Sequence, residues 1–188
     1  GVLGIPDDVW CRSGSTGDAG MKSGLTIRED NYSVVLDALK QLSGTDVLVG
    51  IPAGPPRDDA RLSNAELGYL QSTGATVEID GETVTLPPRP FLDMGIEDSR
   101  DKTTERLKLA AQSALEGKAD VASMHLEAAG QIARDASKAV IEAGDRLTPL
   151  SEKTIKKRRE MKPPIPGDKP LRARGFLLRA IQYVVRKK

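Results

Sequence analysis

The sequence has very few of the residues on which common catalytic and metal sites depend. Its 188 residues include one cysteine, Cys11, and one histidine, His125. A disulfide framework needs a second cysteine, and the common zinc motifs need several cysteine or histidine ligands. A Ser-His-Asp triad would have to use His125 as its base. These counts disfavour most enzyme classes that have a recognisable sequence signature.

Aromatic residues and long hydrophobic runs are also scarce. Aromatic residues make up only 3% of the chain, which argues against the stacking platforms that bind single-stranded nucleic acid. No apolar run approaches the roughly 18–20 residues of a transmembrane helix. The first residues lack the basic segment and long apolar run of an export signal. We therefore expect no membrane association and a protein made in a reducing cytoplasm.

Charge is present in quantity but is unevenly distributed. The net charge is +1, yet residues 146–188 hold 14 Lys or Arg against 3 Asp or Glu, a net +11, which leaves −10 on residues 1–145. Such segregation favours head-to-tail association or contact with a polyanion. A basic tail that is simply solvated is the alternative, and composition alone does not separate the two.

Turn-forming residues and helix periodicity divide the chain. Glycine and serine dominate residues 13–24, so we expect residues 1–30 to form a flexible N-terminal arm. We expect residues 31–188 to form a single α+β domain with a basic C-terminal region. Apolar spacing and capping residues predict, in order, a helix over 31–42, a strand over 46–51, helices over 63–73, 96–115, 119–143 and 151–159, and a segment over 176–185 that begins as a helix and ends as a strand.

A β-hairpin over residues 77–86 is the clearest local signal. Asp80-Gly81 is typical of a two-residue type I′ turn, which sets the pairing register. One face of the hairpin then carries Val77, Ile79, Val84 and Leu86. A two-stranded ribbon is marginal in water, so this face must be covered. Either the hairpin joins the strand at 46–51 or, as we expect, it projects and contacts an adjacent subunit.

The order of these elements predicts an α+β fold. It contains a small mixed or antiparallel sheet with a β-hairpin, packed by two long helices.

One glycine-rich segment is similar to a phosphate-binding loop in composition but does not match the Gly-x-x-x-x-Gly-Lys-Ser/Thr pattern. In residues 14–23, Met21 separates Gly20 from Lys22, and Ser15 stands at the first glycine position. We interpret this segment as a flexible Gly/Ser stretch.

The remaining candidates for chemistry have simpler structural interpretations. His125 lies on the apolar stripe of its predicted helix, as a core or interface histidine does. Cys11 has no neighbour that would activate its thiol. Glu97, Asp98 and Asp101 stand at a helix start, where carboxylates interact favourably with the macrodipole. We therefore predict no catalytic residue, no metal, no cofactor and no enzymatic activity.

A dense basic cluster occupies residues 153–162 and includes Lys156, Lys157, Arg158 and Arg159. These side chains could neutralise phosphates, but no base-reading motif surrounds them. A complementary acidic surface, such as that of another copy, is at least as good a partner.

Five segments in a fixed order resemble a known family. They are Val47-Leu-Val-Gly-Ile-Pro52, Ala65-Glu-Leu-Gly-Tyr-Leu-Gln-Ser-Thr-Gly74, Leu86-Pro-Pro-Arg-Pro-Phe-Leu92, Pro149-Leu-Ser-Glu-Lys-Thr-Ile155 and Asp168-Lys-Pro-Leu-Arg-Ala-Arg-Gly-Phe-Leu-Leu-Arg-Ala-Ile181. In this order they resemble the tail-completion and virion-morphogenesis proteins of long-tailed bacteriophages, a family of minor tail and head-tail joining proteins. The resemblance covers residues 31–188. The sequence departs from the family where Ala173-Arg174 replaces Asp-Thr and Ala180 replaces Ser.

The resemblance implies a structural virion protein of the phage neck, assembled in the host cytoplasm. Such a protein completes the tail and joins it to the head as an oligomeric ring around the DNA channel, here expected to be a hexamer. Its partners would be further copies of itself, other neck and tail proteins and, non-specifically, the DNA. A tail-terminator or head-closure ring protein is an alternative of the same origin. From a different class, a basic-tailed nucleic-acid-binding protein is the other alternative.

The residues themselves, apart from the resemblance, suggest interface positions. Arg89 is held between prolines, so it can be presented at little entropic cost. Phe91 and Leu92 either anchor in a neighbour or close the core of their own chain. Val84 is expected at a contact made by the hairpin. The basic cluster is expected at a subunit interface or facing the channel, through Lys156, Lys157, Arg158 and Arg159.

Overall fold

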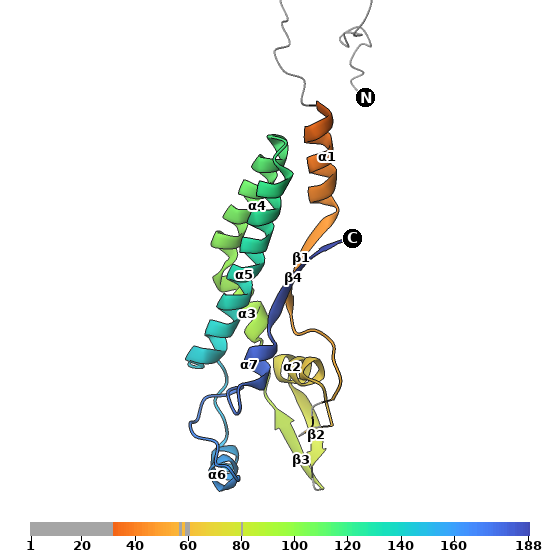
Figure 1. The fold of residues 1–188 in the computed structure, drawn as a ribbon. Coiled ribbons are helices and arrows are strands. Elements are labelled where there is room, and N and C mark those ends of the chain that lie inside the picture. The colour runs from red at the N-terminus through yellow and green to blue at the C-terminus, as the bar shows by residue number, and fades with distance from the viewer. Residues whose placement is uncertain (1–31, 57, 59–60, 80) are drawn as a thin grey trace, which may run out of the picture. The chain divides into compact units, whose positions relative to one another are not determined.

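A computed structural model describes residues 32–56, 58, 61–79 and 81–188 (Figure 1). The predicted arm over residues 1–30, with Cys11 and the glycine-rich segment, lies outside the described residues. The elements follow in the order α1 (Tyr32–Ser43), β1 (Thr45–Gly50), α2 (Asn64–Thr73), β2 (Ala75–Ile79), β3 (Glu82–Leu86), α3 (Phe91–Asp98), α4 (Arg100–Leu115), α5 (Ala119–Ala143), α6 (Glu152–Glu160), α7 (Phe176–Ala180) and β4 (Gln182–Lys187). The predicted α+β class is confirmed.

The two long helices, α4 and α5, form an antiparallel pair joined at Gly117, whose φ of 74° suits glycine (Figure 1). Small buried residues of α5 let its neighbours approach closely; they are Ala122, Ala129, Gly130 and Ala133. Helix α1 packs at the end of this pair, where Ala38, Ala114 and Ala122 are buried together. The helical hairpin therefore provides the scaffold on which β1 and β4 lie.

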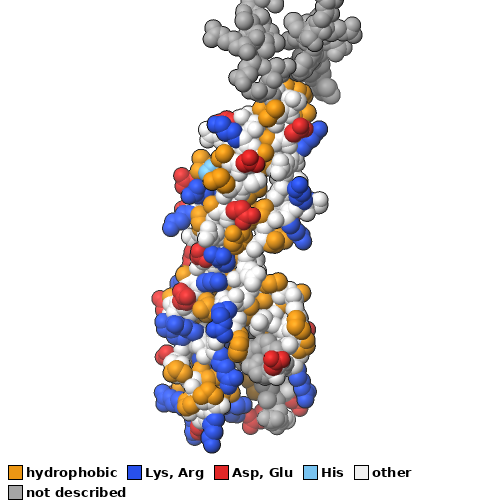
Figure 2. All heavy atoms as spheres, viewed as in Figure 1, with side chains coloured by type: hydrophobic (Ala, Val, Ile, Leu, Met, Phe, Trp, Pro, Cys, Tyr) orange, Lys and Arg blue, Asp and Glu red, His pale blue; other side chains and the backbone are white. Residues whose placement is uncertain are grey.

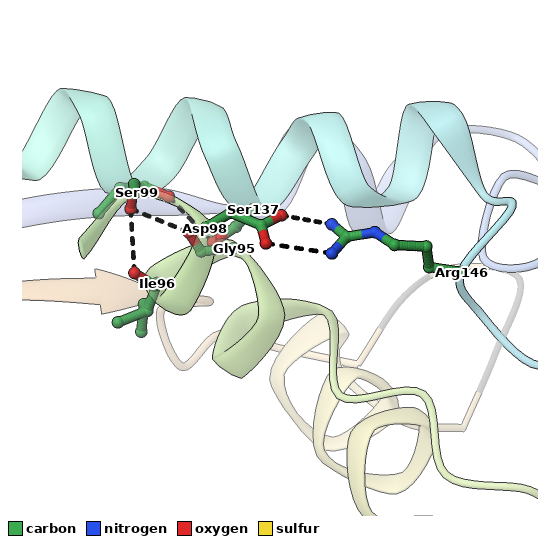
Figure 3. A network of polar contacts seen from close by, with 7 residues as sticks. Gly95, Ile96, Asp98, Ser99, Ser137 and Arg146 are labelled. Carbon is green, nitrogen blue, oxygen red and sulfur yellow. Dashed lines mark hydrogen bonds and ion pairs between the residues drawn. The ribbon is translucent and has the colours of Figure 1, made fainter. Parts of the chain in front are cut away.

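The helix predicted over residues 96–115 is two helices in the structure, a correction at Ser99. The Ser99 hydroxyl donates to the carbonyls of Gly95 at 2.9 Å and Ile96 at 3.2 Å (Figure 3), and Ser99 is the one residue between α3 and α4. A serine hydroxyl that bonds to preceding carbonyls competes with the helical backbone pattern. Helix α3 also begins earlier than predicted, at Phe91, and lies against α5.

The strands form two separate antiparallel sheets. Strand β1 pairs with β4, and β2 pairs with β3 in the predicted hairpin register, with Val77 opposite Val84. The hairpin does not join the β1 sheet. Asp80 of its predicted turn lies outside the described residues.

The main hydrophobic core lies where α3, α5, α7 and the segment after α5 meet. Its buried members are Phe91, Val140, Ile141, Leu147, Leu177 and Ile181. Phe91, Ile141 and Ile181 are fully inaccessible to solvent. Because these residues come from four parts of the sequence, the core fixes the positions of the segments that carry the candidate site.

Helix α2 begins with the predicted capping box. The Ser63 hydroxyl accepts from the Glu66 backbone N–H, and the Glu66 carboxylate accepts from the Ser63 backbone N–H at 2.8 Å. The bond from the Ser63 backbone, and then that from its hydroxyl, lower the pKa of Glu66. Stability from this contact is therefore present above the ordinary pKa of a glutamate and is lost as the pH falls through the lowered value.

We expect Ser63→Ala to lower the free energy of unfolding by about 1 kcal/mol, because the Glu66 backbone N–H loses its acceptor. Urea denaturation at neutral pH measures this loss. Ser72→Ala, on the same helix but away from the cap, is the matched control and should stay within about 0.5 kcal/mol of the wild type. Equal losses in both variants would contradict the capping role.

Candidate functional site

Arg89 lies inside the fold rather than on its surface. Its side chain is only 5% exposed and donates from Nε to the Thr148 carbonyl at 2.7 Å and from Nη2 to the Pro149 carbonyl at 3.1 Å. Nη1 donates to Gln71 Oε1 at 3.3 Å. The expectation that Arg89 is presented on the surface is therefore wrong: its guanidinium ties the end of the hairpin to the segment before α6.

Phe91 and Leu92 also face their own chain. Phe91 is fully buried in the main core, and Leu92 packs against that core. Of the two roles that the sequence left open for Phe91, closing the core is the one seen in this structure.

The basic cluster lies on α6, and its four predicted residues point in different directions. Lys156, Lys157 and Arg159 are exposed, whereas Arg158 is only 9% exposed. Arg158 donates from Nη1 to the Lys169 carbonyl at 3.0 Å, and its own carbonyl accepts from Ile165 N–H. Figure 2 shows Lys and Arg side chains gathered over the end of the domain that carries α6. Arg158 is thus removed from the exposed basic surface.

The hairpin contacts α6 through an ion pair, and its apolar face borders a pocket that α6 also lines. Lys153 Nζ donates to Glu82 Oε2 at 2.7 Å, and this bond lowers the pKa of Glu82. Val84 and Leu86 are half-buried and line a pocket of about 460 Å³ that also touches α6. Val84 and Leu86 therefore border a pocket of their own chain, and the expected contact of the hairpin with an adjacent subunit stays a prediction.

The β1–β4 sheet is covered on one face only. On that face Tyr183 and Val47 approach α5 so closely that a Cβ at Gly130 would lie 2.5 Å from the Tyr183 ring and 3.1 Å from Val47. On the other face Leu48 and Val184 stand opposite each other and are 39% and 51% exposed. A large aliphatic pair in the middle of a sheet is thus left partly open to solvent.

The outer edges of this sheet carry unused backbone groups. Lys188 N–H donates to the Gly44 carbonyl at 2.7 Å, one position beyond the strand pairs. Hydrogen-bonded and non-hydrogen-bonded residue pairs alternate in an antiparallel ladder. The backbone N–H and C=O groups that point away from the partner strand therefore belong to residues 45 and 187, 47 and 185, and 49 and 183. Within the described ranges, no backbone bond beyond the ladder reaches these strand residues.

His125 and the acidic side chains are the remaining candidates for chemistry among the described residues. His125 is half-buried, with Nδ1 3.4 Å from Arg106 Nη1. In the part of the chain that the structure describes, no three His, Cys, Asp or Glu side chains come together to hold a metal. Among the same residues, no helix has the length and apolar character to cross a membrane.

Sequence reasoning overlooked Leu48 and Val184, although a signal was present. Residues 47–49 and 183–185 are apolar at three successive positions. Such runs are typical of strands that are covered on both faces.

Comparison of the chain with protein families, curated proteins and solved structures finds no match.

Proposed function

We propose that this chain is a structural protein of the phage neck, without enzymatic activity, that completes the tail and joins it to the head as an oligomeric ring around the DNA channel. The neck role rests on the five segments that resemble the tail-completion family, and the β1–β4 sheet is the observation that supports assembly into a ring. The sequence of this sheet has the pattern of strands covered on both faces, yet one face holds the exposed pair Leu48 and Val184. Two strands alone also form a marginal sheet.

Pairing between the sheets of neighbouring copies would give hydrogen-bond partners to the backbone N–H and C=O groups on the outer edges of β1 and β4. If β4 of one copy bonds to β1 of the next, each contact joins two different surfaces, and contacts of this kind close into a ring when the rotation between neighbours is a whole fraction of a turn. The added strands stay antiparallel, and the outward N–H and C=O groups gain partners. The segregated charges, −10 on residues 1–145 and +11 on residues 146–188, also favour contacts between unlike surfaces.

Hydrogen exchange on the purified full chain, combined with native mass spectrometry and negative-stain electron microscopy, tests the proposal. In rings, the amides of residues 47, 49, 183 and 185 should be as protected as the ladder amides of 48 and 184. In dissociated chains only the ladder amides should be protected. Chains that stay monomeric, or that form a closed dimer by pairing like edges, would contradict the ring.

Two proline variants give a matched mutational test. Lys187→Pro removes an N–H that points outward, so the melting transition of the single chain should persist while ring formation weakens. Arg186→Pro removes an N–H of the β1–β4 ladder and should destabilise the chain itself. If Lys187→Pro forms rings as readily as the wild type, the edge contact is wrong.

The nucleic-acid-binding alternative rests on the exposed side chains Lys156, Lys157 and Arg159 of α6. Binding of DNA by single chains, with affinity that falls steeply as salt rises and without ring formation, would favour that alternative over the neck protein.

A further inference from the structure

Two buried arginines share one pocket. Arg89 and Arg158 both line the pocket of about 460 Å³ that lies among α2, β3, α6 and the segment before α7. They are 5% and 9% exposed, respectively. The residues lining this pocket include no Asp or Glu. The pocket thus brings together two cations that are 69 residues apart in the sequence, and no acidic side chain lines it.

The two guanidinium groups have only neutral partners among the described residues. Arg89 bonds to two carbonyls and the Gln71 amide, and Arg158 bonds to the Lys169 carbonyl. A guanidinium has five N–H donors, so both groups keep donors that no described protein acceptor uses. Burial lowers the pKa of both groups, and the charge of Arg158 lowers that of Arg89 further. Each cation would therefore be stabilised by a nearby anion.

The rest of the lining defines the shape of the ligand. Six leucine and valine side chains line the pocket: Leu67, Val84, Leu86, Leu150, Leu171 and Leu177. The hydroxyl residues Ser151 and Thr154, at the start of α6, also line it. A planar carboxylate fits the fork of donors on a guanidinium, and an apolar stem fits the aliphatic walls.

We propose that this pocket is a binding site for a carboxylate carried on a short apolar stem, with Arg158 and Arg89 as its anion-binding residues. The proposal does not depend on the ring or on the neck. The carboxylate is supplied either by a free small acid or by an acidic side chain with apolar neighbours on a second copy. The chemistry recognised is the same for both sources.

Hexanoate is the probe, with hexan-1-ol as its neutral counterpart, in calorimetric titrations of the full chain at fixed ionic strength. We expect hexanoate to bind at least about tenfold more tightly than hexan-1-ol, because only the carboxylate engages the guanidinium donors. Hexanoate should also perturb the methyl resonances of Val84 and Leu171. Equal affinity for the two probes, or no perturbation at these methyls, would overturn the proposal without any variant.

A pair of variants on the same helix assigns the anion contact. Arg158→Gln should weaken hexanoate binding by about tenfold or more, whereas Arg159→Gln, which changes an exposed residue, should leave it unchanged. The melting temperature of each variant shows whether it is folded. If Arg158→Gln does not fold, Arg158→Lys takes its place. Lysine keeps the charge but loses the forked donors of the guanidinium, so a smaller loss of hexanoate affinity is expected. Equal effects at positions 158 and 159 would overturn the proposal.

The source of the carboxylate follows from sedimentation of the chain with and without saturating hexanoate. If hexanoate dissociates oligomers, the carboxylate comes from a second copy. If hexanoate binds and the oligomers persist, the natural ligand is a free acid. Either result supports the site, and failure to form rings would leave it standing, so the site and the neck function are tested separately.

Discussion

Replacing Phe91 with alanine is expected to lower the free energy of unfolding by about 3–5 kcal/mol. The side chain is fully buried and belongs to the cluster that joins α3 to α5 and α7, with Ile141 and Ile181 as equally inaccessible neighbours. Buried side chains from several elements surround the site, so we expect the cavity to collapse only in part. A loss of this size is a large share of the 5–15 kcal/mol by which native domains are typically stable.

Equilibrium denaturation in urea, followed by circular dichroism, measures this loss. Phe176→Ala is the matched control, since Phe176 is 38% exposed and lies outside the core cluster. Its replacement should cost about 1 kcal/mol. If Phe91→Ala unfolds like the wild type but fails to form rings, Phe91 anchors in a neighbour, and its assignment to the core of its own chain is wrong.

Local signals in the sequence were sufficient for much of the secondary structure. The bounds predicted for α5 match the structure, because its apolar spacing is regular and Gly144 ends it with a φ of 68°. The capping box of Ser63 and Glu66 fixed the start of α2. The two-residue turn set the hairpin register, with Val77 opposite Val84. Each of these features is decided within a few residues.

Long-range pairing was beyond the reach of the same signals. Strands β1 and β4 were both expected, but nothing in two short apolar runs more than 130 residues apart identifies them as partners. The division at Ser99 depends on one hydroxyl choosing between local carbonyls. Neither feature changes the apolar periodicity on which the helix and strand predictions rest.

The pocket that Arg89 and Arg158 line could not be predicted from the sequence, for a physical reason. Arg158 stands among Lys156, Lys157 and Arg159, and the charge pattern alone does not show which of four cations turns inward. Its orientation is set by the carbonyl of Lys169, which belongs to a later loop. Arg89 carried a signal, its place between two prolines, but that rigidity serves an internal bridge to Thr148 and Pro149.

Gly95 marks the closest approach between α3 and α5. A Cβ at this position would lie 2.4 Å from Ser137 Cα and 2.5 Å from both its backbone N and its Oγ. In Figure 3, Gly95 and Ser137 lie at the contact of these two helices. Two of the three atoms belong to the backbone of α5, so a rotamer change in Ser137 cannot make room.

We therefore expect Gly95→Ala to lower the free energy of unfolding by about 3 kcal/mol, even though alanine is the better helix former by about 1 kcal/mol. Urea denaturation measures the loss, with Gly54→Ala as the control because a Cβ there meets no atom within 4 Å. Adding Ser137→Gly to Gly95→Ala should not restore stability, since it removes Oγ and leaves the backbone contact in place. Full recovery in the double variant would show instead that the hydroxyl sets the helix separation and that the backbones have room to spare.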